Sequence, residues 1–119
     1  MSVLSVIGTP IGNLSDMTYR AVETLKNVDY VAAEDTRHTL QLLNHFEIKK
    51  PLISCRAQNE KFAAEKIVKL LDEGNSVAYA SDAGTPGISD PGFLLARECA
   101  KEGVEVQCLP GATAFVPAL

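Results

Sequence analysis

Short apolar runs alternate with amphipathic segments along almost the whole chain. Each apolar run has the length of a strand, and each amphipathic segment repeats its apolar residues at helical spacing. Strict alternation of strands and helices, with strands that are apolar almost throughout, predicts a parallel sheet that is buried on both faces. We therefore predict an α/β fold, a five-stranded mainly parallel sheet flanked by helices on both faces. The predicted strands are Val3–Ile7, Asp29–Ala33, Pro51–Ser54, Val77–Ala80 and Val104–Leu109.

Polar residues that can cap a helix precede each amphipathic segment. Ser15 or Asp16 is predicted to cap the first helix, and Thr36 the second. The predicted inward faces are Ala21, Val22 and Leu25 in the first helix and Leu40, Leu43 and Phe46 in the second.

The third and fourth helices carry clear stop signals. The third turns Ala63, Ile67, Leu70 and Leu71 inward and ends at Gly74. The fourth has Asp90 at its cap, Pro91 at its first position and Gly103 just past its end, the usual placement of proline and glycine at the two ends of a helix.

Composition places the chain among soluble globular proteins, with 46% hydrophobic and 22% charged residues. A net charge of −4 argues against a large basic surface for nucleic acid on this chain. The three cysteines show neither a disulfide framework nor zinc-ligand spacing, so we expect small buried side chains in a reducing compartment. His38 and His45 are the only histidines, and no cluster completes a metal site around them. Neither a signal peptide nor a membrane span is evident, so a cytoplasmic protein is expected.

The 119 residues suffice for one domain with a single core. The sequence stops at Leu119, just after the start of what reads as another helix. We therefore expect a further domain outside this chain.

The segment Ser81–Gly92 is the most informative stretch of the chain. It is rich in Gly, Pro, Ser and Asp, and it joins a predicted strand to a predicted helix. In open α/β sheets the ligand usually binds beside loops that leave the carboxyl ends of strands. Glycines let the backbone approach a bound molecule, and prolines stiffen the loop. We predict a ligand-binding loop here.

Two further loops are predicted to leave the same edge of the sheet. Gly8–Asn13 lacks the lysine of a Walker phosphate loop and the spacing of a dinucleotide fingerprint, so an ordinary turn is an alternative reading. The second loop, Glu34–Arg37, follows the predicted strand Asp29–Ala33. In its functional reading, Glu34 or Asp35 accepts a proton while Arg37 binds an anionic group such as a phosphate. Its plain alternative is a helix cap at Asp35 or Thr36, with Arg37 paired to a carboxylate.

Four blocks of residues, in this order, resemble one known family. They are Gly8–Leu14, Ala33–Thr39, Ser81–Gly92 and Leu109–Gly111. Together they are similar to the N-terminal half of the RsmI-type ribosomal RNA small-subunit methyltransferases, which belong to the tetrapyrrole (corrin/porphyrin) methylase superfamily.

The resemblance implies two α/β domains with S-adenosylmethionine between them, and methyl transfer to the ribose 2′-oxygen of a cytidine in small-subunit rRNA. It also implies a homodimer. Glu34, Asp35 and Arg37 are the candidate catalytic residues. The residues that the resemblance places at the cofactor are Pro10, Ser81, Asp82, Ala83, Gly84, Thr85, Pro86, Gly111 and Thr113.

One block departs from the family pattern. Arg56 and Gln58 stand where many members carry histidines before an Asn-Glu pair. Two other functions therefore remain open: a methyltransferase acting on a tetrapyrrole or other small molecule, and a non-catalytic α/β module that binds a nucleotide or a protein.

Overall fold

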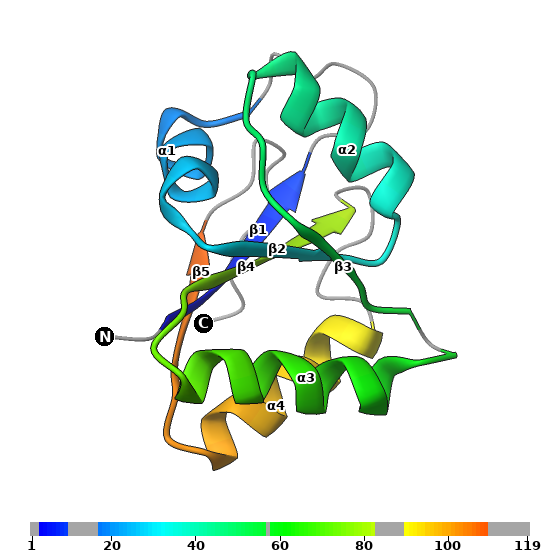
Figure 1. Ribbon diagram of the computed structural model, residues 1–119, viewed down its shortest axis with the longest axis vertical. Helices are drawn as coiled ribbons and strands as arrows, with labels where there is room; N and C mark the ends of the chain where they lie inside the picture. Colours follow the sequence, from blue (N-terminus) through cyan, green and yellow to red (C-terminus); the bar gives the residue numbers. More distant parts are fainter. Residues whose placement is uncertain (1–2, 10–16, 57, 83–89, 110–119) are drawn as a thin grey trace.

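Strands and helices alternate along the residues that the computed structural model describes, which are 3–9, 17–56, 58–82 and 90–109 (Figure 1). The strands are β1 (Val3–Thr9), β2 (Tyr30–Ala33), β3 (Leu52–Ser54), β4 (Val77–Asp82) and β5 (Glu105–Leu109). The helices are α1 (Tyr19–Asn27), α2 (Thr36–His45), α3 (Glu60–Asp72) and α4 (Asp90–Lys101).

The five strands form one sheet in the order β3-β2-β4-β1-β5, and every pair is parallel. The predicted α/β class and parallel sheet are thus confirmed. β4 lies at the centre, although it is fourth along the chain.

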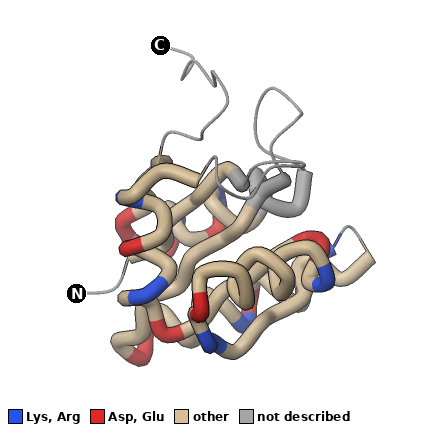
Figure 2. The backbone as a smooth tube through the Cα atoms, turned by 90° about the horizontal axis from the view of Figure 1, so that it is seen from above, with Lys and Arg blue, Asp and Glu red and all other residues tan. Residues whose placement is uncertain are grey.

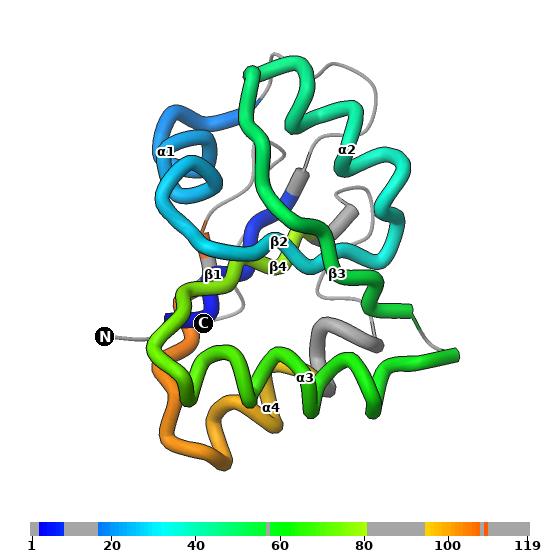
Figure 3. Tube along the Cα trace, viewed as in Figure 1, coloured from blue at the N-terminus to red at the C-terminus, as the bar shows by residue number. Residues whose placement is uncertain are grey.

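Helices cover both faces of the sheet. α1 and α2 lie on one face, and α3 and α4 lie side by side on the other (Figure 3). Each face has its own apolar core, since alternate residues of a strand point to opposite sides. Tyr79 belongs to the core under α3 and α4, and its neighbour Ala80 to the core under α1 and α2.

The predicted cap of α1, Ser15 or Asp16, is wrong by two or three residues, whereas of the two caps weighed for α2, Asp35 and Thr36, Asp35 is confirmed. Thr18 caps α1, where its hydroxyl accepts a hydrogen bond of 3.1 Å from the Ala21 N–H. Asp35 caps α2, where its carboxylate accepts a 3.0 Å bond from the His38 N–H, while Thr36 is already helical. Both regions offer several side chains that can cap, and the start of the buried helical face selects one of them.

The predicted inward face of α2 is also partly wrong. Leu40 is 48% exposed, while Thr39, Leu42 and Leu43 are buried. At 3.6 residues per turn, Leu40 lies about 100° around the helix from Thr39, which takes it away from the core.

The predicted helix ends at Gly74 and Gly103 are confirmed. Both glycines have positive φ angles, 96° and 78°, which side chains with a Cβ rarely adopt. Cys55 and Cys99, the two cysteines whose side chains the structure describes, form no disulfide and are fully buried, which confirms the expectation of small buried side chains. Within the described segments, no helix is long and apolar enough to cross a membrane.

Candidate active site

The carboxyl ends of all five strands line up in one row. In the hydrogen-bonded register, Ala80 of β4 lies beside Ala33 of β2 on one side and Ile7 of β1 on the other. The row continues outward to Ser54 of β3 and Leu109 of β5. Each motif block singled out in the sequence begins, or continues, just beyond this row. Motifs that are far apart in sequence therefore leave a single edge, which we call the carboxyl edge.

β1 and β4 are neighbours, yet the chain leaves them toward opposite faces. β1 leads into α1, whereas β4 leads into α4 on the other side of the sheet (Figure 1). Such a reversal opens a crevice at the carboxyl ends of the two strands, where open α/β sheets bind their ligands. With strands about 4.8 Å apart, the ends of β2 and β1 are about 10 Å apart, close enough to contact one small molecule.

β4 is longer than predicted. Ser81 and Asp82 continue the strand and pair with Gly8 and Thr9 of β1, so the loop begins at residue 83. The other predicted cofactor residues lie outside the described residues: Pro10, Ala83, Gly84, Thr85, Pro86, Gly111 and Thr113. Their placement at the cofactor stays a prediction.

Glu34 and Arg37 lie at the carboxyl edge, between the end of β2 and the first turn of α2. Glu34 is half-buried and Arg37 is exposed. Neither side chain forms a hydrogen bond or an ion pair with another residue in the described part of the chain. The predicted ion pair of Arg37 with a carboxylate is not seen among these residues, although the charge of Arg37 helps to lower the pKa of Asp35.

The side chain of Asp35 caps the N-terminus of α2, so its carboxylate is engaged in a hydrogen bond. Its carboxylate accepts the His38 N–H, and this hydrogen bond is the main cause that lowers the pKa of Asp35 below its ordinary value of 3.8. A carboxylate that is stabilised in its charged form is a weaker base. Of the two acidic candidates, Glu34 is therefore better suited to accept a proton.

A third turn at the same edge follows β3. Cys55, just after the strand, donates its N–H to the Ala33 carbonyl at 2.9 Å. Its thiol is buried, and burial, aided by Glu60 and Glu34, raises its pKa from 9.0 to about 11. Both carboxylates are thus near enough to this thiol to affect its pKa. Glu60, the first residue of α3, was not singled out from the sequence, although an acidic residue in the first turn of a helix after a strand was a usable signal.

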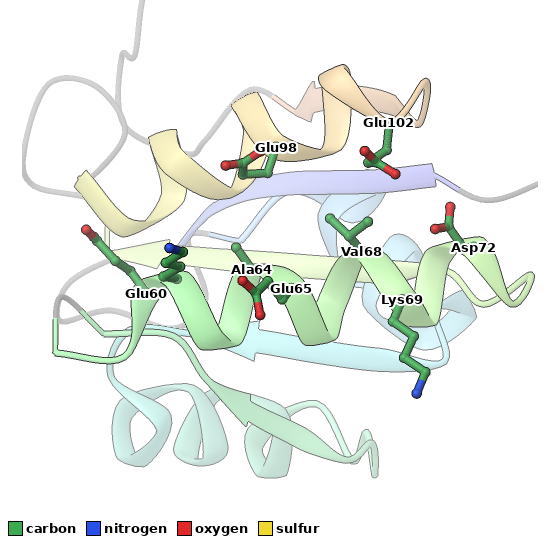
Figure 4. A pocket seen from close by; sticks show the side chains of 9 residues that line it. Glu60, Ala64, Glu65, Val68, Lys69, Asp72, Glu98 and Glu102 are labelled. Atoms are coloured by element: carbon green, nitrogen blue, oxygen red, sulfur yellow. The ribbon is translucent and has the colours of Figure 1, made fainter.

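A groove of about 640 Å³ runs between α3 and α4, on the outer face of that helix layer (Figure 4). Ala64 and Val68 form its apolar part, while Glu98 and Glu102 reach over it from α4. Glu60 lies at the end of the groove nearest the start of α4 (Figure 4). The excess of carboxylates makes the groove unsuitable for an anionic ligand.

Acidic and basic residues are mixed along the described elements (Figure 2). Within the described segments no group of three or more His, Cys, Asp or Glu side chains could hold a metal ion. The carboxyl edge is therefore the candidate active site: β1 and β4 end there side by side and lead to helices on opposite faces, with the half-buried Glu34 and the exposed Arg37 at the same edge.

Comparison with known proteins agrees with this class of fold. Residues 3–119 match the family of tetrapyrrole (corrin/porphyrin) methylases. The chain belongs to that family.

Among curated relatives, the ribosomal RNA small subunit methyltransferase I of Mycoplasmopsis pulmonis is 53% identical over 115 residues, which cover 97% of this chain and 52% of the relative. The protein of the same name from Thermotoga maritima is 52% identical over 119 residues, which cover 100% of this chain and 54% of the relative. The chain spans about half the length of these relatives.

Solved structures share the fold at much lower identity. A uroporphyrin-III-C-methyltransferase from Thermus thermophilus matches with a TM-score of 0.70 at 20% identity, covering 92% of this chain and 47% of that one. A diphthine synthase matches with a TM-score of 0.69 at 16% identity, covering 94% and 45%.

Proposed function

We propose that this chain is the N-terminal domain of an S-adenosylmethionine-dependent methyltransferase that methylates the ribose 2′-oxygen of a cytidine in small-subunit rRNA. Identity of about 50% over the whole chain to proteins named ribosomal RNA small subunit methyltransferase I supports the acceptor. The observation that carries the proposal is the carboxyl edge, because all four motif blocks leave it together. A ribosomal substrate would place the protein in the cytoplasm, and we extend the proposal to that compartment and to a homodimer.

The residues present fit such a donor. β1 and β4 lie side by side and lead to helices on opposite faces, and their pairing continues through Gly8 and Ser81 to Thr9 and Asp82. We assign Ser81–Pro86 to one side of the donor, with Pro10, Gly111 and Thr113 contacting it from neighbouring loops. S-adenosylmethionine supplies an activated methyl group.

The chain's own residues have two tasks in this reaction. A ribose hydroxyl is a weak acid, so its proton must be accepted as the oxygen attacks. Glu34 is assigned this role, because it is half-buried at the edge and its carboxylate makes no bond to another described residue. Arg37 is assigned to a phosphate of the acceptor, since a guanidinium binds phosphate through two parallel hydrogen bonds. Both roles hold the acceptor in line with the donor.

The test uses the intact protein and small ribosomal subunits from cells that lack its gene. Transfer of labelled methyl groups to one ribose is expected, mapped by resistance of the adjacent phosphodiester to alkali. Glu34→Gln should keep donor affinity and lose about 100-fold or more in turnover, the usual contribution of a general base. Gly84→Val should lose donor binding in calorimetry while the fold survives, because its side chain would occupy space needed by the donor.

Asp72→Asn, an exposed substitution at the end of α3, is the matched control and should behave as wild type. If the intact protein binds no S-adenosylmethionine, the methyltransferase proposal is wrong. If it binds the donor but methylates only a small molecule, the rRNA assignment is wrong.

A further inference from the structure

The turn between β3 and α3 carries an arrangement that the proposed reaction does not use. It leaves the carboxyl edge next to the Glu34–Arg37 turn, because β3 pairs with β2 through Ser54 and Ala33. Arg56 is exposed on this turn, and Phe62 is 70% exposed in the first turn of α3. A phenylalanine this exposed costs free energy in water unless a ligand or a partner covers it.

Asn59 fixes the shape of this turn. It occupies the N-cap position of α3, yet its side chain makes no capping bond to the helix. Its Oδ1 instead accepts the Arg56 N–H at 2.7 Å, and its Nδ2 donates to the Ser54 carbonyl at 3.1 Å. Its own N–H donates to the Arg56 carbonyl at 3.0 Å. The backbone on both sides of Arg56 is thus held in place, so binding through Arg56 requires less ordering of the backbone.

A surface hollow of about 470 Å³ lies around Phe62. Its other walls are polar: Gln58, Asn59, Glu60, Lys61 and Glu65. An aromatic ring beside amide and carboxylate groups suits an unpaired nucleobase, which stacks on the ring and donates its amino protons to the oxygens. Glu60 and Glu65 outnumber Lys61 among the lining residues and disfavour a phosphate inside the hollow, so we assign the charged backbone of such a ligand to Arg56, outside it.

We propose that the β3–α3 turn binds one unpaired nucleotide of the acceptor RNA, with Phe62 stacked on its base and Arg56 on its phosphate. This inference rests on the proposed function and names a contact of the same substrate. Arg37 lies on the neighbouring turn, at the same edge of the sheet. Single-stranded RNA is bound in this way when stacking and phosphate contacts act together.

Binding of a labelled single-stranded fragment of small-subunit rRNA to the intact protein tests the inference. Affinity is measured by fluorescence anisotropy over a series of KCl concentrations. Arg56→Gln is expected to weaken binding and to reduce the slope of log affinity against log salt by about 0.7, the change expected for the loss of one phosphate contact on a single strand. Arg97→Gln, an exposed arginine on α4, is the matched control and should leave the slope unchanged.

Phe62 is tested by a pair of substitutions. Phe62→Leu keeps an apolar side chain but removes the stacking surface, and it should lower RNA affinity by about 5-fold or more. Phe62→Tyr keeps the ring and should retain wild-type affinity. Donor affinity, measured by calorimetry, should be the same in all variants, which also shows that they are folded.

If Arg56→Gln keeps the full salt slope, or if Phe62→Leu binds RNA as well as Phe62→Tyr does, the inference is wrong. Wild-type methyl transfer to rRNA is measured in parallel. If the wild type methylates rRNA and the variants bind RNA as the wild type does, only the role of this turn is wrong. If the wild type transfers no methyl group to rRNA, the proposed function itself is wrong.

Discussion

Cys55 shows at the scale of one residue how burial changes chemistry at the candidate site. The side chain is fully buried just beyond β3, within electrostatic reach of Glu34 and Glu60. Burial first, and the two carboxylates second, raise the pKa of its thiol to about 11. The thiol is therefore neutral at physiological pH, and Cys55 acts as a small apolar residue under the edge of the sheet, not as a nucleophile.

We predict a distinctive pH dependence for its alkylation by iodoacetamide in the folded protein. The rate should keep rising about tenfold per pH unit up to about pH 11, whereas an ordinary thiol levels off near its pKa of about 8.5. Peptide mapping by mass spectrometry measures the rate at Cys55 itself, and the urea-unfolded protein is the control. Levelling off near pH 9 in the folded protein would contradict the prediction.

The same shift has a consequence for stability. The folded state keeps the thiol proton to a higher pH than the unfolded chain does. The contribution of Cys55 to the free energy of unfolding is thus complete below about pH 9 and declines as the pH rises toward 11.

The sequence was enough to single out Glu34 and Asp35 as site candidates, but it did not separate their roles. Glu34 and Asp35 read alike in sequence, because both are acidic and both follow a strand. Only the direction of the Asp35 carboxylate, which accepts the His38 N–H, separates the helix cap from the available base. Asn59 was likewise overlooked, since its bonds to Ser54 and Arg56 depend on how the turn closes.

At the scale of elements, α2 depends on its cap. Asp35→Ala should lower the free energy of unfolding by about 1 kcal/mol, because the His38 N–H loses its acceptor. Asp35→Asn should retain most of the stability at neutral pH, since asparagine caps nearly as well. Urea unfolding of the intact protein followed by circular dichroism measures both changes.

Lowering the pH should change the stability of the wild type and of Asp35→Asn to different extents. Because the pKa of Asp35 is lowered in the folded state, its charged cap contributes above the ordinary pKa of 3.8 and is lost as the pH falls below it. Asp35→Asn should lack this part of the acid destabilisation. Equal acid sensitivity in Asp35→Asn and wild type would show that the cap bond is not the cause.

Element types and order followed from the sequence, whereas some boundaries did not. Runs such as Val77–Ala80 are apolar throughout, which is typical of buried parallel strands, so the fold class was predictable. Ser81 and Asp82 read as loop because they are polar, yet pairing with β1 extends β4 through both. Pairing partners are set by tertiary structure, which local propensity does not encode.

The whole molecule places its most protected strand beneath the candidate site. β4 has a partner on each side and helices over both faces, while β3 and β5 are edge strands with one partner each. The strand order that creates this arrangement could not be predicted from the sequence. β4 at the centre and β1 and β2 on either side of it are all apolar almost throughout, so their hydrophobic patterns do not show which of them is central.

We predict that amide hydrogen exchange reflects this order. Amides of Val77–Ala80 and of Leu4–Ile7 should exchange most slowly, whereas those of Leu52–Ser54 and Glu105–Leu109 should exchange faster, because an edge strand opens without disturbing the rest. Exchange followed by mass spectrometry of the intact protein tests this. Protection of β3 equal to that of β4 would contradict the observed order.

The alignment of Ser54, Ala33, Ala80, Ile7 and Leu109 has a consequence for how related proteins diverge. Beyond this line only β1 and β4 remain paired, through Thr9 and Asp82, so insertions and deletions after those two residues, or after the line in the other strands, can reshape what is recognised without shifting the pairing of the sheet. One extra residue before the line would turn every later side chain of that strand to the opposite face. Length variation among relatives should therefore be concentrated after the line, and new acceptors can evolve on an unchanged frame.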